Sequence, residues 1–263
     1  MARLCLLRAS HLREQIERAD ATLREVRYSS AYRPHHYAVA YTAACTTHAK
    51  AALLLAGGEL WPSFWPVGRA AIEAMVWVDR IAADDMKALC EIEIAAIDSR
   101  FSWMGSATKI NTGFAQIVDA SETELTHQLK CLLKRSGVNA KPKTPDLVLA
   151  VDSRMAANCD SQDNWVVGYY FRAWKMFSQS AHMDGNQISN LMSDSSAETF
   201  GSVVVGKSPP DDIAVDVVNV VANALSVAVS RLEDYLRDSQ VTSAGGALVI
   251  APQRIDALNV KER

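Results

Sequence analysis

Apolar residues recur at helix-like intervals along most of this chain. The first segment shows the pattern among arginine and glutamate residues, through Leu4, Leu7, Ile16, Leu23 and Val26. The same periodicity predicts further helices near residues 36–56, 67–83, 86–109, 121–135, 144–157, 163–182 and 211–237. The last of these is rich in valine, which favours strands, but its length without an internal glycine or proline favours a helix.

Glycine, proline and short polar residues mark the expected helix ends. Gly57 and Gly58 end the second helix, and Pro62 and Pro66 precede a third helix that we expect to begin near Val67. Further signals are the Ser121–Glu124 spacing of a capping box, the pair Thr144–Pro145, and Asp211 with Asp212. Residues 193–211 are rich in turn formers, and residues 202–205 suggest a brief strand.

These elements predict an all-α fold, a single helical bundle of long antiparallel helices. We expect one domain over residues 1–239 and a loosely ordered tail over residues 240–263, because the tail lacks a helical pattern. The four central helices are expected to be those that contain Tyr37, Val67, Trp165 and Ile213, since these segments have the longest apolar periodicity.

Composition narrows the class of protein. Of 263 residues, 49% are hydrophobic and 22% are charged, which is typical of a folded globular chain. The net charge of −3 argues against a nucleic-acid binder driven by overall charge. The five scattered cysteines form no CxxC pair and indicate reduced thiols, so we expect a soluble cytoplasmic protein with no membrane span.

One candidate site is a charged pair on an otherwise apolar helix. Arg69 and Glu73 stand four residues apart, so their side chains can meet on one helix face. Large apolar residues surround them in sequence, and we therefore expect a buried pair whose disruption destabilises the protein strongly. Such a pair either anchors a ligand or serves as a structural ion pair between helices, and the sequence leaves both interpretations open.

A second candidate lies on the aromatic helix near residues 163–182. Trp174, Ser178 and His182 are spaced four and four, which places them on one stripe of a helix, and Gln187 follows a short turn later. Histidine at a helix end suits acid–base chemistry, which makes His182 a catalytic candidate together with Arg69 and Glu73. A serine nucleophile at Ser178 is disfavoured because the chain has no Gly-x-Ser-x-Gly elbow.

Metal and cofactor signals are weak. Glu124 and His127 have the Glu-x-x-His spacing of helical di-iron proteins, but the second copy that such sites need is missing. Cys45 and His48 form an isolated pair, and neither a Walker loop nor a dinucleotide fingerprint occurs. We therefore predict no metal and no cofactor, and we interpret the basic residues at 130–143 as a solvated surface.

Two stretches resemble a bacterial family of all-helical domains of unknown function. Residues 47–80 match its first half, a helix ending in glycine followed by an aromatic–proline entry, Arg-x-x-x-Glu and tryptophan. Residues 165–188 match its second half, where the family tends to have His-Thr-Gly-Gly-x-Gln and this chain has His182-Met-Asp-Gly-Asn-Gln187. The resemblance implies an all-α fold in which Arg69, Glu73, His182 and Gln187 converge, and it implies no activity.

The favoured function is that of a binding or interaction protein with a polar cluster at Arg69, Glu73, Ser178, His182 and Gln187, for a small ligand or a partner. The alternative is a metal-independent, ribonuclease-like helical toxin or defence effector acting on RNA, in which Arg69 would replace a missing nearby arginine. Whether the chain is an enzyme stays open. Large aromatic residues in 60–77 and 165–177 further predict a homodimer or larger assembly.

Overall fold

The computed structural model describes residues 9–28, 31–110, 115–136, 143–157, 168–181, 209 and 211–244. Within them the chain is all-α, a bundle of long antiparallel helices without strands. The helices are α2 (Ser10–Glu25), α3 (Arg33–Gly57), α4 (Trp61–Ala83), α5 (Asp85–Ile110), α6 (Ala115–Ser136), α7 (Thr144–Ala157), α8 (Tyr169–Ala181) and α10 (Asp211–Ala244). The suggested strand at 202–205 and residues 245–263 of the expected tail lie outside the described residues, whereas residues 240–244 of that tail form the end of α10.

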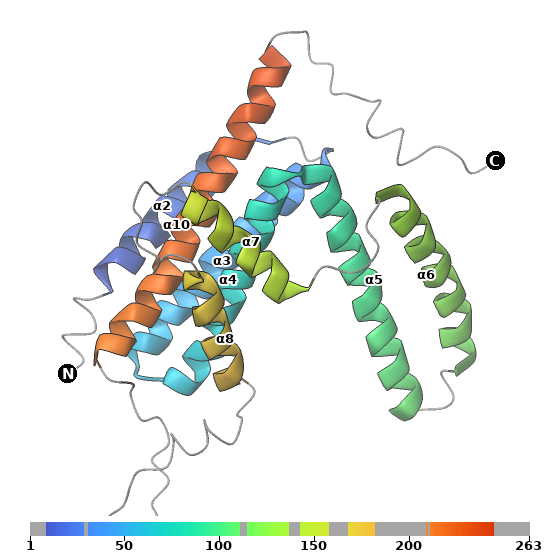
Figure 1. Cartoon of the computed structure of the whole chain (residues 1–263), viewed down its shortest axis with the longest axis horizontal. Coiled ribbons are helices and arrows are strands. Elements are labelled where there is room, and N and C mark those ends of the chain that lie inside the picture. The colour runs from blue at the N-terminus through green and yellow to red at the C-terminus, as the bar shows by residue number, and fades with distance from the viewer. Residues whose placement is uncertain are drawn as a thin grey trace, which may run out of the picture.

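The core of the bundle is built by α3, α4 and α10, which pack against one another (Figure 1). The face of α3 that packs on its neighbours has small residues, and Cys45, Ala49 and Ala52 on it are fully buried. Small side chains let the helices approach closely. The interior of α10 is a valine and leucine stripe that ends near Leu236, and the last turns of this helix extend past the bundle. Three of the four helices expected at the centre therefore occupy it.

The remaining helices cover this core. The fourth expected central helix, α8, packs mainly on α4, whereas α2 lies across α10 and α3. The helix α2 uses the amphipathic stripe of the sequence, with Leu12, Ile16 and Ala19 buried and arginine and glutamate facing outward. The short helix α7 contacts both α8 and α4.

The pair of helices α5 and α6 projects from the bundle as an arm (Figure 1). Ala88 and Ile92, in the first part of α5, belong to the core of the bundle, and α6 packs on α5. The arm has its own small core, formed by Ile97, Met104 and Leu125, and it leaves Trp103 70% exposed. This core is far smaller than that of the bundle, so the arm depends on its attachment through α5.

Three helix starts differ from the sequence-based expectation. The helix α8 begins at Tyr169 and not near residue 163, because the chain makes a turn at Gly168. The helix α4 begins at Trp61, with Pro62 in its first turn and Pro66 inside it, and not at Val67. Pro66 removes one helical hydrogen bond, and burial of Trp61 and Phe64 in the core offsets that loss. The helix α6 begins at Ala115, so Ser121 lies within it and is not its N-cap.

One described helix is long and apolar enough to cross a membrane. It is the segment Asp211–Ser239 of α10, with a mean hydropathy of 1.8. However, 56% of that window is buried inside the bundle. A core helix of a globular protein has the same composition, so the apolar character of α10 is accounted for by its packing against α3 and α4.

Candidate functional site

Arg69 and Glu73 meet on α4 and contact α8 through Trp174. The Nε of Arg69 donates to Oε1 of Glu73 at 2.8 Å, and the indole Nε1 of Trp174 donates to the same oxygen at 3.0 Å. The guanidinium carbon of Arg69 lies 5.3 Å from the centroid of the Trp174 ring, within the range of a cation–π interaction. We call these three residues the α4–α8 cluster.

The cluster is half-buried, in contrast to the sequence-based expectation of a buried pair. The side chain of Arg69 is 28% exposed and that of Glu73 is 32% exposed. The reason is the position of the pair on α4, since residues such as Ile72 and Met75 form the face turned to the core. Because water reaches both charges, the ion pair contributes less to stability than a buried one would.

The Glu73 carboxylate has acceptor capacity to spare. Both hydrogen bonds that it forms in the described part of the chain fall on Oε1. A carboxylate offers about four lone-pair positions on two oxygens. The Oε2 of Glu73 can therefore accept an N–H or O–H group from a bound molecule without breaking either contact inside the cluster.

The structure describes three of the five predicted site residues. It joins Arg69 and Glu73, and it places Ser178 one turn beyond Trp174 on α8, where its hydroxyl donates to the Trp174 carbonyl at 2.7 Å. The Ser178 proton is thus engaged within the helix, which fits the argument against a serine nucleophile. His182 and Gln187 lie outside the described residues, directly after α8 ends at Ala181.

The position of α8 is fixed by Asp152 of α7. Its two carboxylate oxygens accept the backbone N–H groups of Tyr170 at 3.0 Å and Phe171 at 2.9 Å. These donors belong to the first turn of α8, so Asp152 caps this helix from another part of the chain. Burial raises the pKa of Asp152, and the two N–H groups partly oppose that rise.

The turn before α8 uses Gly168 at a φ of +83°, a conformation that favours glycine.

A more deeply buried charge lies two turns along α4 from the predicted pair. Asp79 is 2% exposed and accepts from Nη2 of Arg154 on α7 and, at 2.8 Å, from Nε of Arg231 on α10. Burial and the neighbouring Arg231 lower the pKa of Arg154. The sequence indicated that Asp79 is buried, since it follows three apolar residues of a core helix. It did not indicate the two arginine partners, which are 75 and 152 positions away.

A second charged contact joins α4 to the arm. Arg80 donates from Nε and Nη2 to the two carboxylate oxygens of Glu91, each at 2.8 Å. The Glu91 side chain is 5% exposed, and this paired geometry is the strongest form of an arginine–carboxylate contact. The hydrogen bonds with Glu91 raise the pKa of Arg80, the largest effect on that group. The contact fixes the base of α5 against the bundle.

The residues of the weak metal-binding patterns form contacts with other side chains or with the backbone. Glu124 accepts from the amide of Gln128 at 2.8 Å, and His127 lies 3.7 Å from the sulfur of Cys131. Cys45 is fully buried, where burial raises its pKa to about 12 and its thiol faces the Ala71 carbonyl. Among the described residues, no group of three or more histidine, cysteine, aspartate or glutamate side chains is placed to hold a metal ion.

Comparison of the chain with protein-family models, with curated proteins and with solved structures finds no match. The class of protein is therefore defined by the fold, an all-α helical bundle with a projecting helical arm. The resemblance to a bacterial helical family stays a prediction, and function has to be argued from the geometry of the α4–α8 cluster.

Proposed function

We propose that this chain is a helical binding protein and that the α4–α8 cluster holds a small polar ligand. The observation that carries the proposal is the Glu73 carboxylate, which accepts two hydrogen bonds on Oε1 and offers Oε2 at a partly exposed position. Trp174 adds an aromatic surface, and Arg69 holds the carboxylate in place. A ligand with an N–H or O–H donor next to an apolar portion matches these groups.

The sequence extends this site beyond the described residues. His182 follows Trp174 and Ser178 at the same four-residue spacing, and Gln187 comes shortly after. Both side chains can donate and accept hydrogen bonds, so they would add specificity to the carboxylate of Glu73. In this proposal Arg69, Glu73, Ser178, His182 and Gln187 are binding residues, and no chemical step is assigned to them.

The test uses native mass spectrometry after incubation with the low-molecular-mass fraction of a bacterial extract. We expect the wild-type protein to retain a metabolite-sized molecule, and Glu73→Gln to lower its occupancy about tenfold because an amide cannot replace the charged acceptor. The control is Glu25→Gln, which removes an exposed carboxylate at the end of α2. Equal retention by Glu73→Gln, or no retention by the wild type, would contradict the proposal.

The alternative, a metal-independent ribonuclease, is tested on total RNA with His182→Ala as the control. Cleavage by the wild type that is lost in His182→Ala, with an unchanged melting temperature, would replace the binding proposal. The described residues contain no observation that favours this outcome. Arg172, the arginine of α8 nearest in sequence to His182, is exposed and lies in the first turn of the helix, at the end remote from Ala181.

We also propose a homodimer, although the aromatic residues that suggested it are largely used inside the bundle. Trp61, Phe64, Tyr170 and Phe177 are among the largest fully buried side chains. The large apolar side chains that are exposed include Leu54 and Leu60 near the α3–α4 turn and Trp103 on the arm. Light scattering tests the proposal, since a mass of 28.7 kDa at high concentration would show a monomer.

A further inference from the structure

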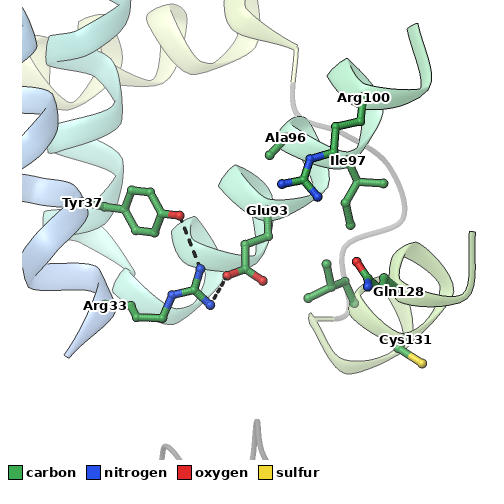
Figure 2. A pocket seen from close by; sticks show the side chains of 9 residues that line it. Arg33, Tyr37, Glu93, Ala96, Ile97, Arg100, Gln128 and Cys131 are labelled. Carbon is green, nitrogen blue, oxygen red and sulfur yellow. Dashed lines mark hydrogen bonds and ion pairs between the residues drawn. The ribbon is translucent and has the colours of Figure 1, made fainter. Parts of the chain in front are cut away.

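A cleft separates the bundle from the arm, and its walls come from α3, α5 and α6. Its volume is about 380 Å³, within the range of about 300–1,000 Å³ typical of small-molecule sites. Figure 2 shows the residues that line it. The polar groups are Arg33, Tyr37, Glu93, Arg100 and Gln128. The lining is completed by the side chains of Ala96, Ile97, Cys131 and Leu132.

One wall of the cleft is electrically balanced. The Nη1 of Arg33 lies 2.5 Å from Oε1 of Glu93, and its Nη2 donates to the Tyr37 hydroxyl at 3.4 Å (Figure 2). The guanidinium of Arg33 also lies 5.8 Å from the centroid of the Tyr37 ring. The charge of Arg33 is thus matched by Glu93, and two of its nitrogens contact groups in the same wall.

The charge of Arg100 is not balanced in this way. Within the described residues Arg100 forms neither an ion pair nor a hydrogen bond, and Figure 2 shows its guanidinium directed into the cleft. Gln128 projects toward α5 from the other side, with its amide oriented by the 2.8 Å hydrogen bond to Glu124. The cleft therefore combines one unmatched positive charge with an apolar surface.

We propose that this cleft binds an organic monocarboxylate with an apolar body. The planar guanidinium of Arg100 can receive a carboxylate through two parallel hydrogen bonds, while Ile97 and Leu132 contact the apolar portion. A single charge fits because Arg33 and Glu93 cancel each other, leaving a net charge of one. A phosphate dianion would bring a second negative charge that no cation of the cleft compensates. This site is separate from the α4–α8 cluster and does not depend on its proposed function.

The position of the cleft adds a physical consequence. Arg33 and Tyr37 belong to the bundle, whereas Gln128 and Leu132 belong to α6 of the arm. The proposed contacts, Arg100 and Ile97 on α5 and Leu132 on α6, join the two helices of the arm, so a bound ligand stabilises the packing of α6 on α5. Binding should therefore slow amide hydrogen exchange in α6 more than in α4, which gives a readout besides affinity.

The experiment is calorimetric titration of the full chain with 4-phenylbutyrate and hexanoate, compared with 4-phenylbutyramide and inorganic phosphate. We expect both carboxylates to bind, and the amide and phosphate to bind at least about tenfold more weakly. The amide has no negative charge to pair with Arg100, and the phosphate dianion has one more than the cleft can compensate. Arg100→Gln should weaken carboxylate binding by about ten- to a hundredfold. Its melting temperature should stay that of the wild type, because Arg100 has no partner to lose among the described residues.

The matched control is Arg13→Gln, which removes an exposed arginine on α2. It should bind both carboxylates as the wild type does. The proposal is overturned if neither carboxylate binds, if the amide binds as well as the acid, or if Arg100→Gln keeps wild-type affinity. Tighter binding of inorganic phosphate than of either carboxylate would equally overturn it, because the cleft would then recognise a dianion.

Discussion

Gly68 of α4 lies so close to Phe177 of α8 that a β carbon on residue 68 would be 2.7 Å from Cε2 of the ring. Both residues are buried, and the ring of Phe177 lies 6.0 Å from that of Phe64 and 5.7 Å from that of Trp65. A side chain at position 68 would therefore overlap the ring of Phe177. The same contact holds Trp174, one turn earlier on α8, near Glu73.

We predict that Gly68→Ala destabilises the protein despite the better helix propensity of alanine. The propensity gain is about 1 kcal/mol, whereas overpacking against a ring fixed by other aromatic residues costs about 1–3 kcal/mol. The control is Gly57→Ala, because a β carbon on residue 57 meets nothing within 4 Å. Urea unfolding should show a loss for Gly68→Ala and no loss for Gly57→Ala, and a stabilised Gly68→Ala would disprove the close approach.

Asp79 should matter more for stability than Glu73, although the sequence drew attention to Glu73. Asp79→Asn leaves Arg154 and Arg231 facing a neutral group, and we expect a cost of about 3 kcal/mol. Glu73→Gln changes a pair that is about one third exposed, and we expect less than about 1 kcal/mol. Comparing the two variants by chemical denaturation checks the order, and a larger loss for Glu73→Gln would reverse our assignment of the buried charge.

The contrast between these two carboxylates shows what local patterns can reveal. The contact between Arg69 and Glu73 was predictable because four-residue spacing on a helix brings side chains together. Their exposure was not, because it depends on which neighbouring helix covers that flank of α4. The partners of Asp79 come from two distant helices, and helical periodicity carries no information about such pairings.

The fold itself was largely predictable, since apolar periodicity depends on short-range spacing. Helix boundaries were less so where tertiary packing prevails over local signals. Pro66 is tolerated inside α4 because Trp61 and Phe64 anchor the turns before it in the core. Likewise, the projection of the α5–α6 arm follows from how few long-range contacts it makes, which the sequence pattern of each helix does not encode.

Glu59 offers a route to a more stable protein. It has a φ of +57° directly after Gly57 and Gly58, although glycine is the residue that favours this conformation. The N–H groups of Glu59 and Leu60 close the end of α3 on the carbonyls of Ala56 and Leu55, so the backbone there is fixed.

We expect Glu59→Gly to raise the free energy of unfolding by about 0.5–1 kcal/mol, since relief of the left-handed strain exceeds the added freedom of the unfolded chain. Glu59→Ala is the matched control. It removes the charge but keeps a β carbon, so its stability should stay near that of the wild type. A gain of equal size in both variants would point to the charge of Glu59, and not to its backbone conformation.

His35 makes stability depend on pH. Its ring lies 4.8 Å from that of Tyr32 and 5.3 Å from that of Tyr235, and both ring nitrogens are buried with no hydrogen-bond partner among the described residues. Burial lowers the pKa of His35 from its ordinary value of 6.5, and the nearby Asp85 opposes the shift without cancelling it. Asp85 is held by the two tyrosines, since the Tyr32 hydroxyl donates to it at 2.6 Å and the Tyr235 hydroxyl at 3.0 Å.

A lowered histidine pKa means that the unfolded chain binds the proton more readily than the folded one. The free energy of unfolding should therefore rise with pH up to about 6.5 and fall as the pH drops below that value. We expect His35→Phe, which keeps an aromatic ring between the tyrosines, to reduce the loss of stability between about pH 7.5 and pH 5. His36→Gln, at the exposed neighbouring position, should keep the wild-type dependence. Denaturant titrations at the two pH values decide the matter, because an unchanged pH dependence in His35→Phe would show that His35 does not bind the destabilising proton.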